Sequence, residues 1–95
     1  MAIKFNPDFA EAYNNLGAVL FNAKMTEEAI DYFKEAIRIR PGFAEAHNNL
    51  GIALFNTKMT EEAIDYLKEA IRIRPGFAAA QKNLETALLL SEELE

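Results

Sequence analysis

The sequence contains no cysteine and only one histidine. Without cysteine the chain can form neither a disulfide framework nor a thiolate metal site, which fits a reducing compartment. No apolar run approaches the roughly 20 residues of a membrane span, and the N-terminus lacks the pattern of a secretory signal. We therefore expect a soluble, cytoplasmic protein that does not enter membranes.

Positive charge is also in short supply. The 95 residues include 10 Lys and Arg against 15 Asp and Glu, for a net charge of -5. A general nucleic-acid binder needs a basic face to displace counterions from phosphate, so we expect no nucleic-acid partner. With 51% hydrophobic and 26% charged residues, the composition is that of a globular protein. A single central core would be marginal at this length, and a stack of short helices is a natural alternative.

A long internal repeat dominates the sequence. Displacing the chain by 34 residues places Ala10–Phe43 over Ala44–Phe77 with five differences, so 29 of 34 positions are identical. The pairs that differ are Tyr13/His47, Ala18/Ile52, Val19/Ala53, Ala23/Thr57 and Phe33/Leu67. We interpret residues 1–8 as the end of a preceding partial repeat, 9–42 and 43–76 as two full units, and 77–95 as a C-terminal capping helix, the first helix of a third unit.

Apolar residues at spacings of three and four predict a helix in the first half of each unit. In the first unit this helix spans about Phe9–Asn22, and we expect Asp8 to cap its start. In the second unit it spans about Phe43–Asn56, with Gly42 as a weaker cap.

A second helix follows in each unit. We expect it to open at Thr26, whose hydroxyl would accept hydrogen bonds from the first free backbone N–H groups. It ends near Arg40, because Pro41 disfavours helical geometry in the residue before it, and Arg74 and Pro75 repeat this stop. Few residues separate the two helices, so they should be antiparallel neighbours.

The second helix is apolar over more than one narrow stripe, so it must bury two flanks. The first helix of its own unit and that of the next unit can cover them, which predicts an all-α open stack. Gly17 and Gly51 lie within helices, where Gly costs about 1 kcal/mol relative to Ala. We interpret them as points where two helices approach closely, with Ala29 and Ala63 as the opposing small residues.

The residues at fixed positions in each unit resemble the tetratricopeptide repeat, whose period is also 34 residues. The matching positions are Tyr13, Leu16, Gly17, Leu20, Ala29, Phe33 and Pro41, and then His47, Leu50, Gly51, Leu54, Ala63, Leu67 and Pro75. The resemblance implies a right-handed superhelical solenoid of antiparallel helix pairs, whose first helices line a concave groove that takes an extended peptide or a partner's helix. The sequence departs from the family at Lys24 and Lys58, where Gly is common between the helices.

The first helices carry side chains suited to such a groove. Asn15, Asn49 and Asn83 would form a ladder across the units, and an amide that both donates and accepts suits the backbone of an extended peptide. This ladder resembles the one in O-linked N-acetylglucosamine transferases. Alternatively, the asparagines bond one helix to the next, and Phe21 and Phe55 pack at the edge of the core. The candidate peptide-binding residues are Asn14, Asn15, Ala18, Phe21, Asn22, Asn48, Asn49, Ile52, Phe55, Asn56, Lys82 and Asn83.

Members of the family that bind chaperones grip a terminal carboxylate with a clamp of Lys, Asn and Arg side chains. Asn14, Ala18, Ala79 and Asn83 stand at four of the five matching positions, where the clamp requires Lys, Asn, Lys and Arg. Only Asn49 agrees with the clamp. The comparison disfavours a heat-shock chaperone tail as the partner.

The sequence offers no catalytic, cofactor or metal site. His47 replaces Tyr13 near a helix start, and we expect a partly buried spacer there rather than a catalytic base. Acidic pairs such as Glu27 and Glu28 stand at helix starts, where they stabilise the helix dipole, and no His or Cys accompanies them as a metal ligand. We predict a protein that is not an enzyme and that binds a protein or peptide partner.

Two other hypotheses remain open. The chain could be a structural unit that self-associates into a homo-oligomer through apolar flanks at its two ends. These flanks lie near Ile3, Phe5, Leu84, Leu88 and Leu90. The chain could also be a regulatory segment of a larger enzyme whose catalytic domain lies elsewhere.

Overall fold

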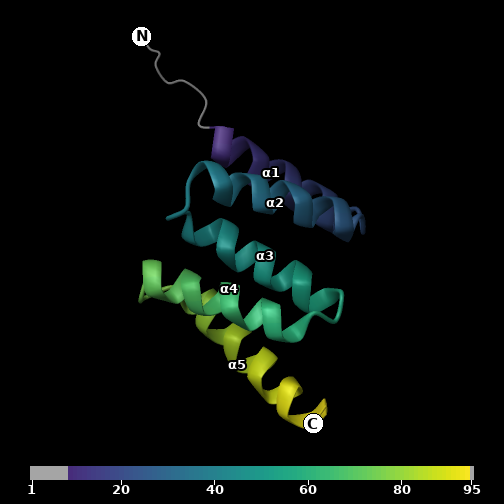
Figure 1. Ribbon diagram of the computed structural model, residues 1–95, viewed down its shortest axis with the longest axis vertical. Coiled ribbons are helices and arrows are strands. Elements are labelled where there is room, and N and C mark those ends of the chain that lie inside the picture. Colours follow the sequence, from purple (N-terminus) through teal and green to yellow (C-terminus); the bar gives the residue numbers. More distant parts are fainter. Residues whose placement is uncertain (1–8, 95) are drawn as a thin grey trace.

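The computed structural model describes residues 9–94, with side chains through Ser91. These residues form five α-helices stacked in chain order along the long axis of the molecule, which measures 53 × 29 × 18 Å (Figure 1). Each helix packs on the next, and α3 also touches α1 and α5. The prediction of an all-α helical repeat is confirmed. The helices are α1 (Phe9–Asn22), α2 (Thr26–Ile39), α3 (Ala44–Asn56), α4 (Thr60–Ile73) and α5 (Ala78–Leu94).

The predicted helix stops at the prolines are confirmed. Helix α2 ends at Ile39, and the backbone N–H of Arg40 donates to the carbonyl of Ala36 over 2.9 Å. Helix α4 ends in the same way, with the N–H of Arg74 donating to Ala70 over 3.0 Å. In each case the following proline lacks the N–H that would continue the ladder.

Helix α2 begins at Thr26 as predicted, but the caps expected from Thr26 and Gly42 are wrong. Met25, not Thr26, is the N-cap of α2, and no side chain caps the helix. Likewise, α3 starts at Ala44 with Phe43 as its N-cap, so Gly42 lies outside the capping position. The backbone of Met25 takes the N-cap position because its N–H bonds to the carbonyl of Leu20 in the preceding turn, while its carbonyl accepts from the N–H of Ala29. The cap expected from Asp8 lies outside the described residues.

The turn between the helices of a unit closes α1 with paired backbone hydrogen bonds. The N–H of Met25 donates to the carbonyl of Leu20 over 2.9 Å, and the N–H of Lys24 donates to Phe21 over 3.0 Å. Such a pair requires a left-handed residue after the helix, usually Gly. Lys24 adopts it with φ of 67°, and Lys58 does so in the second unit with φ of 69°. Lys24 and Lys58 thus take the left-handed conformation at the position where the family commonly has Gly.

The core runs between neighbouring units. Phe33, Leu50, Leu54 and Leu67 are the largest fully buried side chains, and they come from α2, α3 and α4. Helix α2 packs against both α1 and α3, so it buries the two flanks that its apolar pattern predicted. Stability therefore arises from contacts between neighbours along the stack.

The two helical glycines lie where helices pack closely. A Cβ on Gly17 would stand 2.6 Å from Cε1 of Phe33. A Cβ on Gly51 would stand 2.7 Å from Cγ of Leu67 and 3.3 Å from the carbonyl oxygen of Ala63. The close approach was correctly predicted, but the atoms nearest to Gly17 belong to the Phe33 ring rather than to Ala29.

Candidate functional site

Asparagine side chains join the first helices of successive units. The Nδ2 group of Asn49 on α3 donates to Oδ1 of Asn14 on α1 over 3.0 Å. One unit further on, Nδ2 of Asn83 on α5 donates to Oδ1 of Asn48 on α3 over 3.1 Å. The acceptors Asn14 and Asn48 are only 5% and 6% exposed, whereas Asn49 and Asn83 are half-buried. These bonds support the alternative in which the asparagines connect one helix to the next.

The ladder residues keep polar atoms that these bonds do not use. An Asn amide has two N–H donors and an oxygen acceptor, and the inter-unit bond of Asn49 uses one donor. Within the described residues, no hydrogen bond occupies Oδ1 of Asn49 or Oδ1 of Asn83. Asn15 is exposed and forms no side-chain hydrogen bond with the rest of the described chain. All three amides retain polar atoms for a ligand.

Beside each ladder residue that bridges two units lies a small hollow. The hollow beside Asn49 has a volume of about 120 Å³, and the one beside Asn83 has a volume of about 90 Å³. The first is lined by Ala18, Phe21, Asn22, Phe33, Asn49 and Ile52, and the second by Gly51, Ile52, Phe55, Leu67, Asn83 and Thr86. Most positions in the two linings correspond at the 34-residue period, so the surface repeats with the sequence.

A larger, open hollow of about 440 Å³ lies where the helices of the first unit turn. It is lined by Phe21, Asn22, Lys24, Thr26 and Asn56. Phe21 and Asn22 also line the hollow beside Asn49, so the two spaces share a wall. The surface is continuous from the turn to the asparagine ladder.

The structure brings together many of the candidate residues, but not all. Asn14 and Asn48 are buried as hydrogen-bond acceptors. Asn15 and Lys82 are exposed and line none of these hollows. The candidate residues that line a hollow are Ala18, Phe21, Asn22, Asn49, Ile52, Phe55, Asn56 and Asn83.

Sequence reasoning missed several lining residues that lie on or next to the second helices. Phe33 and Leu67 were identified only as fixed positions of the repeat pattern, yet each lines one hollow. A signal was present, because Ala18/Ile52 and Phe33/Leu67 are two of the five positions at which the units differ. The differences between otherwise identical units therefore fall partly on the hollows. The other lining residues that were missed are Lys24, Thr26, Gly51 and Thr86.

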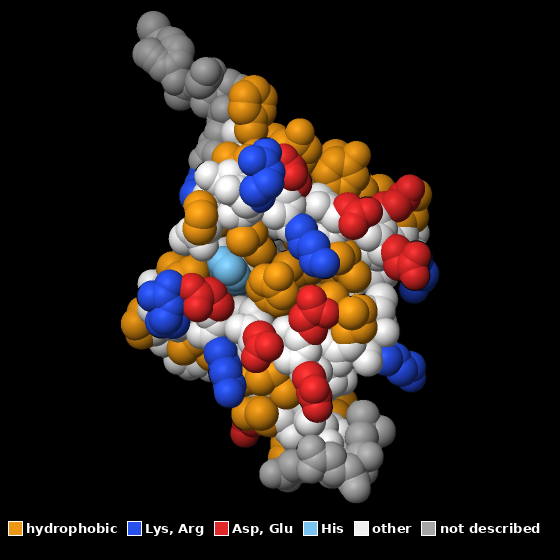
Figure 2. Space-filling view, viewed as in Figure 1, with side chains coloured by type: hydrophobic (Ala, Val, Ile, Leu, Met, Phe, Trp, Pro, Cys, Tyr) orange, Lys and Arg blue, Asp and Glu red, His pale blue; other side chains and the backbone are white. Residues whose placement is uncertain are grey.

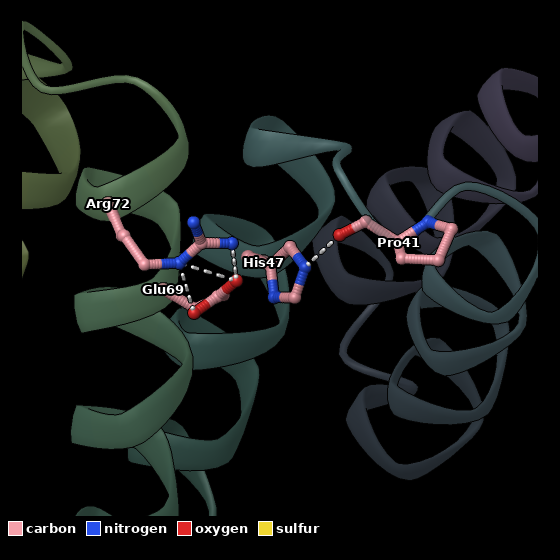
Figure 3. Close-up of polar contacts among 4 residues, drawn as sticks. All are labelled: Pro41, His47, Glu69 and Arg72. Carbon is pink, nitrogen blue, oxygen red and sulfur yellow. Dashed lines mark hydrogen bonds and ion pairs between the residues drawn. The ribbon is translucent and has the colours of Figure 1, made fainter.

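His47 is a packing residue at the junction of the units (Figure 3). It is 6% exposed, its Nε2 group donates to the carbonyl of Pro41 over 2.8 Å, and its ring lies 5.8 Å from that of Tyr66. Its Nδ1 atom is buried without a hydrogen-bond partner among the described residues. Gln81 stands at the position equivalent to His47 in the next unit. Its side-chain amide donates to the carbonyl of Pro75 over 2.7 Å, as His47 does to Pro41. These contacts agree with the interpretation of His47 as a spacer, although its side chain is more completely buried than expected.

Ion pairs lie on α2 and α4, the helices that carry no ladder asparagine. Nε of Arg38 donates to both carboxylate oxygens of Glu35 over 3.1 Å, and Glu69 and Arg72 repeat the pair (Figure 3). The hydrogen bond from each Arg lowers the pKa of the Glu carboxyl below its ordinary value of 4.5. Both pairs are exposed and join residues three apart on one helix, so they contribute little to stability.

Other chemistries find no support in the part of the chain that the structure describes. Among residues 9–94, no group of three or more His, Asp or Glu side chains is arranged to hold a metal ion. None of the helices α1 to α5 is both long and apolar enough to cross a bilayer.

Solved structures share this architecture. The second tetratricopeptide domain of Spaghetti (RPAP3), bound to the HSP90 peptide SRMEEVD, matches with a TM-score of 0.87 and 22% identity over 90% of this chain and 80% of that one. The TPR2B domain of yeast Sti1 in its pHsp70 complex matches with a TM-score of 0.88 and 26% identity over 92% and 70%. MamA matches with a TM-score of 0.79 and 32% identity over 82% of this chain and 43% of its own. This chain thus spans less than half of MamA.

No curated protein matches this sequence. A sequence model of the tetratricopeptide repeat matches residues 8–75, which is most of the chain and includes α1 to α4. The helix pairs, the glycines at the close approaches and the prolines at the unit boundaries are the features expected of that repeat. The chain belongs to the tetratricopeptide repeat family.

Proposed function

We propose that this chain is a non-catalytic scaffold that binds an extended segment of a partner protein along the surface shared by α1, α3 and α5. The observation that carries the proposal is the repeated pairing of a ladder asparagine with a small hollow. Asn49 lines one hollow and Asn83 lines the other. The partner's backbone would bond to the amides, and its side chains would enter the hollows.

The size of the two hollows beside Asn49 and Asn83 favours side chains over small molecules. Pockets for small ligands and cofactors usually enclose about 300–1,000 Å³, whereas these two hollows measure about 120 and 90 Å³. Each can take a single apolar side chain. Their linings differ at three corresponding pairs, Ala18/Ile52, Phe33/Leu67 and Ile52/Thr86, which would give a bound peptide a preferred register.

The buried asparagines then serve as supports. Asn14 holds Asn49, and Asn48 holds Asn83, each through one hydrogen bond. An amide held in one orientation loses less conformational entropy when it binds a ligand. The free Oδ1 atoms would accept from peptide N–H groups, an interaction that does not depend on the partner's sequence.

The partner differs from those in the two peptide complexes above. One of those complexes holds an HSP90 peptide and the other pHsp70. Here Asn14 and Ala18 stand where a carboxylate clamp needs Lys and Asn, and Asn14 is buried. An internal, extended segment with small apolar side chains fits this surface better than a charged chain terminus.

Binding of a library of unbiased, capped extended peptides, measured by fluorescence anisotropy, tests the proposal. We expect Ala18→Arg to abolish binding, because the new side chain fills the hollow beside Asn49. Lys68→Ala on the exposed side of α4 is the matched control and should bind like the parent chain. Equal binding by Ala18→Arg and the parent, with both folded, would exclude this surface as the site.

A further inference from the structure

The hollow where the helices of the first unit turn, called the turn hollow below, is rich in hydrogen-bond donors. It measures about 440 Å³, and its polar side chains are those of Asn22, Lys24, Thr26 and Asn56. Within the described residues, no hydrogen bond or ion pair occupies any of these four side chains. A Lys ammonium has three donors and no acceptor, and the Asn amides and the Thr hydroxyl can also donate. This set of groups suits a ligand that accepts hydrogen bonds.

The charge of the turn hollow is positive. Lys24 is the one charged residue in its lining. Glu27 and Glu28 follow Thr26 in the chain, but neither of them lines the hollow. Hydrogen bonds between an ammonium and a carboxylate are roughly twice as strong as those between neutral groups. A carboxylate therefore matches both the donors and the charge.

The turn fixes the point from which the Lys24 side chain starts. Lys24 has a φ of 67°, and its N–H donates to the carbonyl of Phe21 over 3.0 Å. Lys58 takes the same conformation in the second unit, with a φ of 69°, but it lines none of the three hollows. Leu90 stands at the position equivalent to Asn56, so the second unit lacks one of the amide donors. The donor set thus belongs to the first turn.

The rest of the molecule does not have this preference for an anion. The chain carries a net charge of -5, and Figure 2 shows acidic and basic side chains interspersed over the face in view. A net negative charge by itself favours basic partners. Any preference for an acidic group must therefore come from a local site.

The turn hollow is continuous with the proposed peptide surface, because Phe21 and Asn22 also line the hollow beside Asn49. Alternate side chains of an extended peptide point to the same side, about 7 Å apart. A residue two positions from the one in the hollow beside Asn49 can therefore reach the turn hollow. A small molecule fits less well, since small-ligand sites enclose most of the ligand and this hollow is open.

We propose that the turn hollow is a subsite for an Asp or Glu side chain of the partner, two positions from the small apolar residue that enters the hollow beside Asn49. This inference rests on the proposed function. The ammonium of Lys24 and the amides of Asn22 and Asn56 would donate to the carboxylate. The subsite is not the carboxylate clamp, because Lys24 lies in the turn, whereas the clamp positions Asn14 and Ala18 lie within α1.

Capped extended peptides that carry glutamate two positions from valine are the probes, with binding to the full-length chain measured by fluorescence anisotropy. Matched peptides carry glutamine or lysine in place of the glutamate. The caps remove the terminal charges, so the side chain is the only source of a carboxylate. We expect the glutamate peptide to bind about fivefold more tightly than the glutamine peptide, and the lysine peptide to bind most weakly.

Substitutions at the two turns locate the effect. Lys24→Gly removes the ammonium and suits the left-handed conformation, so this variant should fold and should bind the glutamate and glutamine peptides equally. Lys24→Glu should prefer the lysine peptide. Lys58→Gly and Lys58→Glu make the same changes at the equivalent turn and should keep the preference of the parent chain.

Two results would overturn the subsite: equal binding of the glutamate and glutamine peptides by the parent chain, or the same loss of preference in the Lys24 and Lys58 variants. Ala18→Arg distinguishes these results from a failure of the proposed function. If Ala18→Arg is folded and binds the glutamine peptide like the parent chain, the proposed surface itself is wrong. If it abolishes binding while glutamate gives the parent no gain, only the acidic subsite is excluded.

Discussion

The Nδ2 group of Asn49 donates to Oδ1 of Asn14 across the boundary between units, over 3.0 Å. Asn14 is 5% exposed, and Asn49 lines the hollow next to it. One hydrogen bond thus links the stability of the stack to the orientation of a group on the proposed peptide surface. The same relationship recurs between Asn83 and Asn48.

Asn49→Ala should lower the free energy of unfolding by about 1–3 kcal/mol, because it leaves the buried oxygen of Asn14 without a partner. Asn14→Ala combined with Asn49→Ala should cost less than the sum of the two single changes. Urea denaturation of the four chains measures this coupling. Additive costs would mean that the bond contributes nothing in solution.

Asn15→Ala separates binding from stability. Asn15 is exposed and forms no side-chain hydrogen bond with the described residues, so its loss should change the free energy of unfolding by less than about 0.5 kcal/mol. It should nevertheless weaken peptide binding if the ladder contacts a ligand. Parallel denaturation and anisotropy measurements on this variant decide whether Asn15 belongs to the surface. If Asn15→Ala binds peptide with the affinity of the parent chain, Asn15 is not part of the binding surface.

Gly51→Ala should destabilise the protein by about 1–3 kcal/mol, despite the better helix propensity of Ala. The added Cβ would stand 2.7 Å from Leu67 Cγ and 3.3 Å from the backbone oxygen of Ala63, which cannot rotate away. Gly76→Ala is the control, because nothing lies within 4 Å of the added atom. Thermal melting compares the two, and equal midpoints would contradict the close packing.

Lys58→Gly should raise the free energy of unfolding by roughly 0.5 kcal/mol. A non-Gly residue at φ of 69° is strained by about 1–2 kcal/mol, and the flexibility of Gly in the unfolded chain offsets part of the relief. Lys58→Ala keeps the Cβ and the strain, so it should gain nothing. Urea midpoints that rise equally for both variants would show that the lysine side chain, not the backbone, sets the cost.

Arg38→Gln should raise the pKa of Glu35 toward its ordinary value of 4.5, because the hydrogen bond from Arg38 is the main cause of the lowered pKa. A carboxyl with a lowered folded-state pKa stabilises the fold above its unfolded pKa and loses this effect as the pH falls through the folded pKa. The carbon chemical shift of the Glu35 carboxyl during acid titration reports the change. The same titration midpoint in both chains would show that the pair does not persist in solution.

Much of the fold could be predicted from local signals. Pro41 and Pro75 end helices by backbone chemistry, and Gly17 and Gly51 indicate close packing because Gly within a helix has a cost that a close approach can offset. The caps expected from Thr26 and Gly42 were wrong because the residue types common at helix starts reflect only a preference. At Thr26 the backbone of the turn from Lys24 already sets where the helix begins.

The candidate site was harder to predict because it depends on how one unit rotates against the next. Asn14 and Asn49 are 35 positions apart, one more than the period, so no alignment of the units pairs them. The roles of Asn14 and Asn15 also could not be separated by pattern, although one is buried and the other exposed. Phe33 was identified as a fixed position of the repeat pattern, but its place in the lining of a hollow also depends on the position of α3.

The most direct test of the central claim is an amide-resolved NMR titration of the chain with a peptide selected from the library. If the surface of α1, α3 and α5 is the binding site, the side-chain amides of Asn15, Asn49 and Asn83 shift together with Ile52, and the amides of exposed residues on α4 such as Lys68 stay still. Shifts confined to α2 and α4, with the three asparagine amides unchanged, would contradict the account.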